Sequence, residues 1–133
     1  MGLRLFLTIV SVVFALLGLG LLFVPEAAMG PYAISLDASG VIMGRIAGGA
    51  FVGLAIVFWY ARDADMAAAM SPALKGVLYG GCAMNVIALI AALWVVIPGR
   101  VSAGGWIIVA VHAIFVAGFL YYADFGRRAA PAG

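Results

Sequence analysis

The sequence predicts an all-α integral membrane protein, folded as a single antiparallel, up-and-down four-helix bundle. Four long apolar stretches fill most of the 133-residue chain, and only 9% of its residues are charged, against about 25% in a typical soluble domain. About 20 residues of helix cross a hydrocarbon core of roughly 30 Å, and lipid tolerates only structures that satisfy their own backbone hydrogen bonds. We therefore expect one transmembrane domain, 1–133, with helices at approximately 4–24, 40–61, 72–97 and 103–124.

The first apolar stretch, Leu5–Val24, carries no charge. It is longer than the apolar region of a secretory signal peptide, which has roughly 7–15 residues, so we expect a retained membrane helix. This helix should end near Val24-Pro25, and Gly30-Pro31 should keep the following segment irregular.

The other three helices have recognisable ends. Asp37 and Ser39 offer capping side chains before the second apolar stretch, Val41–Tyr60. Ser71-Pro72 combines an N-cap residue with proline at the first helical position. Pro98-Gly99 should end the third helix, and the few residues before the fourth make these two helices antiparallel neighbours.

The positive charges predict the orientation of the bundle. One side of the membrane would carry five cationic residues and the other side two. Because cytoplasmic segments are enriched in Lys and Arg, we expect both termini in the cytoplasm and the protein in the bacterial inner membrane. The two groups are Arg4, Arg62, Lys75, Arg127 and Arg128, and Arg45 and Arg100.

Small residues recur at helical spacing and predict close helix packing. Membrane helices associate through such residues because lipid provides no hydrophobic drive between helices. The same spacing can also form a dimer face. On the last helix, Ala110, Ala113 and Ala117 form a stripe that we expect to face the interior. The expected packing glycines are Gly44, Gly48, Gly49, Gly53 and Gly81.

Three polar residues within the apolar stretches are candidate ligand-binding residues, since such groups are costly in a membrane. Arg45 could extend to the surface, pair with Asp37 or Glu26, or bind an anionic group at the mouth of a cavity. Asn85 could form an interhelical hydrogen bond or line a polar cavity.

His112 is the sole histidine and falls near the middle of the last helix. It could bond a neighbouring helix, handle a proton, contact a substrate, or serve as the axial ligand of a haem or chlorophyll-type pigment. The neighbours on its face are bulky, so we expect this face to meet lipid or a partner. These neighbours are Ile108, Val109, Phe115, Val116 and Phe119.

No catalytic set is recognisable. The sequence has no paired histidine metal motif, no carboxylate pair within the apolar stretches and no phosphate-binding loop. We therefore expect no catalytic residues, no metal, and no cofactor unless His112 binds a pigment, and an enzyme is the least supported class of function. The chain has no basic run to bind nucleic acid, and its single cysteine, Cys82, excludes an intrachain disulfide.

The chain has, in order, a first helix ending at Pro25, an Asp37-led loop, and a second helix with Arg45 followed by Gly48 and Gly49. This order resembles small bacterial four-helix membrane proteins of unknown function that are DoxX-like in size and layout. The resemblance implies a four-helix membrane fold and no particular reaction. Members of that group often carry an arginine and an acidic residue about where this chain has Asn85 and His112.

Three functions are consistent with these observations. The first is a structural or accessory protein, either a subunit of a larger membrane complex or a homo-oligomer, whose partners are lipids and other membrane subunits. The second is a lipid- or small-molecule-binding or transport protein with a pocket lined by Arg45, Asn85 and His112. The third is a pigment- or haem-binding subunit that uses His112.

Overall fold

The computed structural model describes residues 2–64 and 70–128, with side chains as far as Asp124, and is entirely helical over these ranges apart from the short connections. Four helices are long and apolar enough to cross a membrane, so the chain is a multi-pass membrane protein. In chain order the elements are α1 (Leu3–Phe23), α2 (Pro25–Met29), the 3-10 turn η1 (Gly30–Tyr32), α3 (Ala38–Ala61), α4 (Pro72–Val96) and α5 (Gly105–Arg128).

Side chains cap the starts of α3 and α4. The Asp37 carboxylate accepts a hydrogen bond of 2.7 Å from the backbone N–H of Gly40. The Ser71 hydroxyl accepts one of 3.1 Å from Leu74 N–H, and Pro72 occupies the first helical position. Each cap satisfies one of the backbone donors that a helix start leaves without a partner. Both helices therefore begin at the capping residues that the local sequence predicts.

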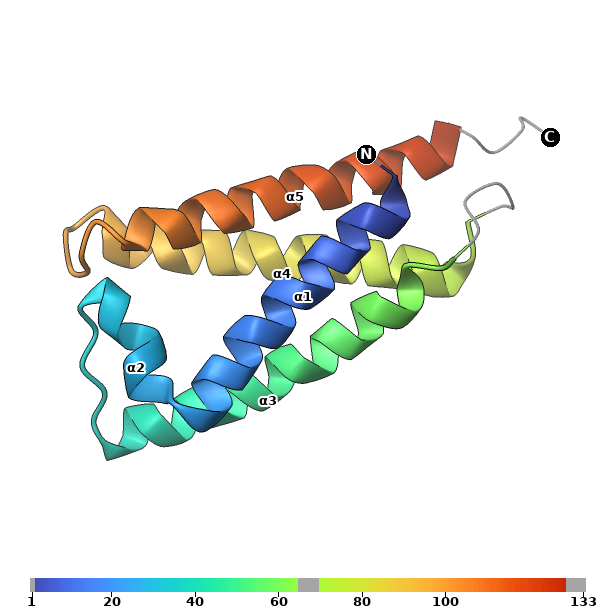
Figure 1. Cartoon of the computed structure of the whole chain (residues 1–133). Helices are drawn as coiled ribbons and strands as arrows, with labels where there is room; N and C mark the ends of the chain where they lie inside the picture. The colour runs from blue at the N-terminus through green and yellow to red at the C-terminus, as the bar shows by residue number, and fades with distance from the viewer. Residues whose placement is uncertain (1, 65–69, 129–133) are drawn as a thin grey trace.

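The end of α4 is fixed by backbone geometry. Gly99 adopts a left-handed conformation, with φ of +71°. Its N–H donates to Val96 O, and the N–H of Arg100 donates to Val95 O, both at 3.0 Å. This pair of bonds is the Schellman arrangement, which uses glycine because a side chain is strained at positive φ. The chain turns sharply here and returns as α5, so α4 and α5 are antiparallel neighbours (Figure 1).

The segment after α1 is helical rather than irregular as the sequence suggested. Pro25 begins α2, because proline is favoured at a first helical position, and Ala33, at φ of +56°, ends η1. Ser102, in the α4–α5 connection, donates its N–H to Tyr32 O at 3.0 Å and its hydroxyl to Pro31 O at 2.9 Å. These bonds join the α2–η1 segment to the connection between α4 and α5.

The four long helices pack as two pairs, α1 with α3 and α4 with α5. In Figure 1 the ends of α1 and α3 next to α2 lie apart from the neighbouring ends of α4 and α5, and α2 occupies the space between them. At the opposite end α1 begins and α5 finishes. The two helix pairs therefore lie close together at the end of the bundle where α1 begins. At the other end, α2, η1 and Ser102 connect them.

An aromatic cluster joins the two pairs. Phe6 of α1 packs edge-on against Phe119 of α5, with ring centroids 5.0 Å apart, and Phe58 of α3 lies 5.4 Å from the same ring. Edge-to-face contacts of this kind stabilise by about 0.5–1.5 kcal/mol beyond the area buried. Four further aromatic side chains continue the cluster: Phe14, Phe51, Phe115 and Tyr122.

The glycines divide into internal and external sets. Gly48 lies against Gly18 and the Leu22 backbone of α1, Gly81 lies against the Phe119 ring, and a Cβ on Gly44 would meet Pro25 at 3.4 Å. Gly49 and Gly53, which the sequence analysis assigned to helix packing, are exposed, and a Cβ at either would meet no neighbour within 4 Å among the described residues. Adjacent positions on α3 point in different directions, and only one direction meets α1.

The face of α5 that packs against the rest of the bundle is not the one we expected. Its alanine stripe, Ala110, Ala113 and Ala117, is exposed, whereas Phe115 and Phe119 are buried. The physical reason is complementarity of size. Gly81 on α4 and Gly118 on α5 leave room for aromatic rings, and the rings of Phe119 and Phe6 respectively fill that room.

Replacing Gly48 with valine should separate α1 from α3. A Cβ there would stand 2.6 Å from Leu22 N and 2.7 Å from Gly18 O, which are backbone atoms that cannot rotate away. We expect a loss of about 1–3 kcal/mol or more. Thermal unfolding in detergent can be followed with a thiol-reactive dye, because the only cysteine, Cys82, is buried. Gly80→Val, at an open α4 position, is the control, and equal melting temperatures would contradict this packing.

Candidate functional site

Two of the three polar candidates meet inside the α4–α5 pair. The Nδ1 atom of His112, on α5, lies 2.9 Å from the Oδ1 atom of Asn85, on α4. Asn85 is fully buried, and its Nδ2 atom donates to the carbonyl oxygen of Gly81, one turn earlier on the same helix, at 2.8 Å. A polar side chain is thus held in the centre of a membrane helix with both ends of its amide bonded.

This arrangement fixes the orientation of both side chains. The Gly81 carbonyl can only accept, so the Asn85 atom that faces it is the amide nitrogen, and the oxygen faces His112. An amide oxygen also only accepts, so His112 donates through Nδ1–H. In a neutral ring the lone pair then resides on Nε2. The network selects one imidazole tautomer without a carboxylate.

The Nε2 atom of His112 is the chemically available atom of this pair. In the part of the chain that the structure describes it has no hydrogen-bond partner, and the residue is only half-buried. A nitrogen of this kind can accept a hydrogen bond or ligate a metal, and histidine ligands usually donate their other N–H to a carbonyl or carboxylate. No group of three His, Cys, Asp or Glu side chains in the described ranges could hold a metal ion. Ligation would therefore need a metal that brings most of its own ligands, as a haem does.

Arg45 is not part of this arrangement. It lies on α3, in the other helix pair, and is exposed. Within the described residues it forms no ion pair with the predicted partners Asp37 and Glu26. The Asp37 carboxylate instead caps α3. The structure thus brings together two of the three residues proposed to line a pocket.

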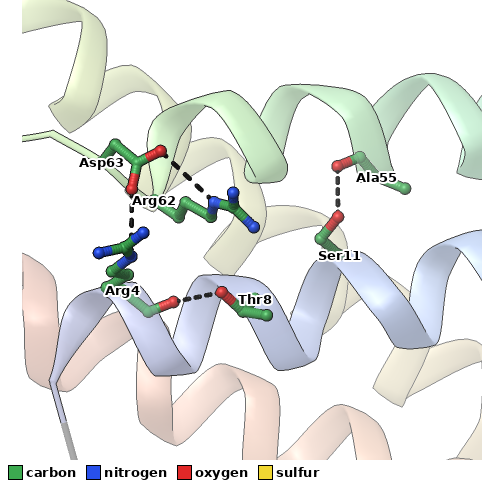
Figure 2. Close-up of polar contacts among 6 residues, drawn as sticks. All are labelled: Arg4, Thr8, Ser11, Ala55, Arg62 and Asp63. Atoms are coloured by element: carbon green, nitrogen blue, oxygen red, sulfur yellow. Dashed lines mark hydrogen bonds and ion pairs between the residues drawn. The ribbon is translucent and has the colours of Figure 1, made fainter.

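A polar network that the sequence analysis missed lies at the end of the bundle where α1 begins. The Asp63 carboxylate lies between two guanidinium groups, with Arg4 Nε at 3.2 Å and Arg62 Nε at 3.5 Å (Figure 2). The Arg62 guanidinium also stacks 3.3 Å from the centroid of the Trp59 ring. The signal was available, since Arg4 and Asp63 flank the ends of two antiparallel apolar stretches.

The same α1–α3 pair is joined by a hydroxyl inside the membrane. Ser11 donates to the Ala55 carbonyl of α3 at 2.7 Å, whereas Thr8 donates to Arg4 O of its own helix, also at 2.7 Å (Figure 2). Ser11 is buried, and the backbone oxygen it reaches already belongs to a helix. The sequence pattern does not predict which of these two hydroxyls bonds to α3, because that depends on which face of α1 packs against α3.

A double-mutant cycle should measure the coupling between Asn85 and His112. We expect Asn85→Ala and His112→Ala each to lower thermal stability, and the double variant to lose less than the sum. The coupling energy should be about 0.6–1.7 kcal/mol, as for other interhelical hydrogen bonds in membranes. Exposure of Cys82 to a thiol-reactive dye reports unfolding. Additive losses would mean that the 2.9 Å contact contributes nothing.

Comparison with known proteins identifies no family for this chain. No family model matches it, and neither the curated proteins nor the solved structures contain a match. The resemblance to DoxX-like proteins is supported only in that the chain has four long apolar helices. What the structure establishes is four long apolar helices of the kind that cross a membrane, packed as two pairs.

Proposed function

We propose that this chain is a small accessory membrane protein that works through helix–helix contact, as a homo-oligomer or as a subunit of a larger complex in the bacterial inner membrane. Connections are short wherever the structure describes them, and the polar contacts found are structural in kind. Such a protein would offer its partners the outer surfaces of its own membrane helices.

One observation carries this proposal, namely the outward-facing glycines of α3. Gly49 and Gly53 are four residues apart, exposed, and open to space where a side chain would begin. Paired small residues at this spacing let the backbone of another helix approach closely, which is the main source of association in lipid. Within this chain the close approach of α1 uses Gly48 instead. As far as the described residues go, the Gly49–Gly53 face is therefore open to a helix from outside.

The proposed orientation has both termini in the cytoplasm. It is supported by the position of Arg4, Arg62 and Lys75, which lie at or near the helix ends on the side where α1 begins. Arg100 follows α4 at the opposite end. Positive residues are enriched on the cytoplasmic side of membrane proteins.

Cysteine cross-linking in native membranes tests the accessory role. In a Cys82→Ala background, Gly53→Cys should form a disulfide on oxidation in a homo-oligomer, giving twice the mass of the chain. A different subunit, which need not carry a cysteine, should be captured at another mass by a photoreactive group attached to the same thiol. Ile87→Cys, which places the thiol on an exposed position of α4 (69% exposed in the parent), is the matched control. Equal or absent cross-linking at both positions, together with a monomer on a native gel, would refute the proposal.

The second candidate function is binding of a lipophilic ligand at His112. It is favoured by the hydrogen bond to Asn85, which orients the ring of this half-buried residue and leaves its Nε2 atom without a partner among the described residues. The ligand would be a molecule with a hydroxyl or N–H donor, or a haem or chlorophyll-type pigment whose metal accepts one axial nitrogen. Arg45 would take no part in this version of the site.

Co-purification tests the second candidate. Protein extracted in mild detergent should carry a small molecule, visible by mass spectrometry or by absorption in the visible range. His112→Leu should lose it, and Asn85→Leu should weaken its retention by about 10- to 100-fold, as loss of an orienting partner does for ligating histidines. Arg45→Gln should retain it in full. A colourless wild-type protein with no bound molecule beyond bulk lipid would reject this function.

A further inference from the structure

An apolar groove runs along the outer surface of α4 towards its C-terminal end. It is shallow and wide open to the outside, with a volume of about 470 Å³, and it is lined by Ile90, Leu93, Trp94, Ile97, Pro98 and Arg100. The first four of these are spaced by three, one and three residues, which places them on one face of the helix. Ile90, Trp94 and Ile97 are strongly exposed, at 58%, 69% and 70%. The groove is therefore part of the surface of the molecule rather than of its core.

One end of this groove carries a positive charge, on a residue whose backbone is fixed. The backbone of Arg100 is held by its bond to Val95 O and by the left-handed Gly99 before it, so the residue occupies a defined place just beyond the helix. Arg100 is exposed, and within the described ranges no carboxylate pairs with it. By contrast, Arg4 and Arg62 at the other end of the bundle share Asp63.

We propose that this groove is a binding site for an anionic phospholipid. One acyl chain lies along Ile90, Leu93, Trp94 and Ile97, and the phosphate group accepts hydrogen bonds from the Arg100 guanidinium. The apolar wall and the cation lie in the order in which a lipid presents its chain and its headgroup. Trp94 lies near the end of α4, at the depth where tryptophan side chains gather at membrane interfaces.

The charge and shape of the groove favour a lipid over other occupants. Arginine binds phosphate oxygens through a planar fork of donors, but a single exposed arginine holds free phosphate weakly in water, where salt screens the attraction. A lipid adds the contact of its chain with the apolar wall. The outward small-residue faces lie on α3, on α5 and, at Gly76 and Gly80, on the first half of α4 away from the groove. A helix packing closely against this chain therefore has better surfaces than a groove lined by isoleucine and tryptophan.

Fluorescence quenching of Trp94 by brominated acyl chains tests the site. The probe protein carries Trp59→Phe and Trp106→Phe, which leaves Trp94 as its only tryptophan. It is placed in phosphatidylcholine nanodiscs with a minor fraction of brominated-chain phosphatidylglycerol or, in parallel, of brominated-chain phosphatidylcholine. The anionic lipid should quench Trp94 at an apparent affinity about fivefold higher, the preference that one arginine near a membrane surface supplies.

Matched arginine variants test whether Arg100 causes the preference for the anionic lipid. Arg100→Gln should abolish this preference. Arg45→Gln, which removes another exposed arginine outside the groove, should leave the preference unchanged. Inorganic phosphate should fail to compete. The proposal is overturned if both lipids quench equally in the parent protein, if the preference survives Arg100→Gln, or if free phosphate removes it. Trp94 shielded from both lipids would instead identify a protein helix as the occupant and would equally overturn it.

Discussion

The close approach of α1 and α3 at Gly18 and Gly48 is the contact on which the remaining architecture depends. In lipid, apolar side chains gain nothing by leaving one hydrocarbon environment for another, so helices associate where their backbones can come near. Here the two glycines leave no room for a Cβ on either helix. The same proximity brings the Ser11 hydroxyl within 2.7 Å of the Ala55 carbonyl. With α1 committed to α3, the remaining two helices pair with each other.

The second pair uses a different solution, in which large rings occupy spaces left by glycine. Phe119 of α5 lies over Gly81 of α4, and the Phe6 ring of α1 lies over Gly118. These rings belong to the cluster that joins the two pairs at the end of the bundle where the chain starts. Because Asn85 lies one turn from Gly81, the same close packing that admits Phe119 also brings the amide to His112. The polar pair is therefore a property of α4 and α5 alone.

The functional features lie on separate faces of the bundle. The proposed contact glycines, Gly49 and Gly53, belong to α3, the available imidazole nitrogen to α5, and the apolar groove with its arginine to α4. An accessory protein that meets a partner through α3 could hold a lipid on α4 at the same time, because the two surfaces share no residue. The buried hydrogen bond of Asn85 stabilises the scaffold in either case. Such a division suits a chain whose described connections are short and whose functional surface must be the helices themselves.

Sequence alone determined the number of spans and the ends of several helices, because those depend on local properties. Length, apolarity and the scarcity of charge define a membrane helix, and Asp37, Ser71 and Gly99 act on their own turns of backbone. It also singled out Asn85 and His112 as costly groups in a membrane. Tertiary structure decided which face of each helix turns inward, and it placed Gly49 and Gly53 outside, Phe119 inside and Arg45 away from the polar pair. Those choices depend on how well the surfaces of two helices fit, and no pattern within one helix contains that information.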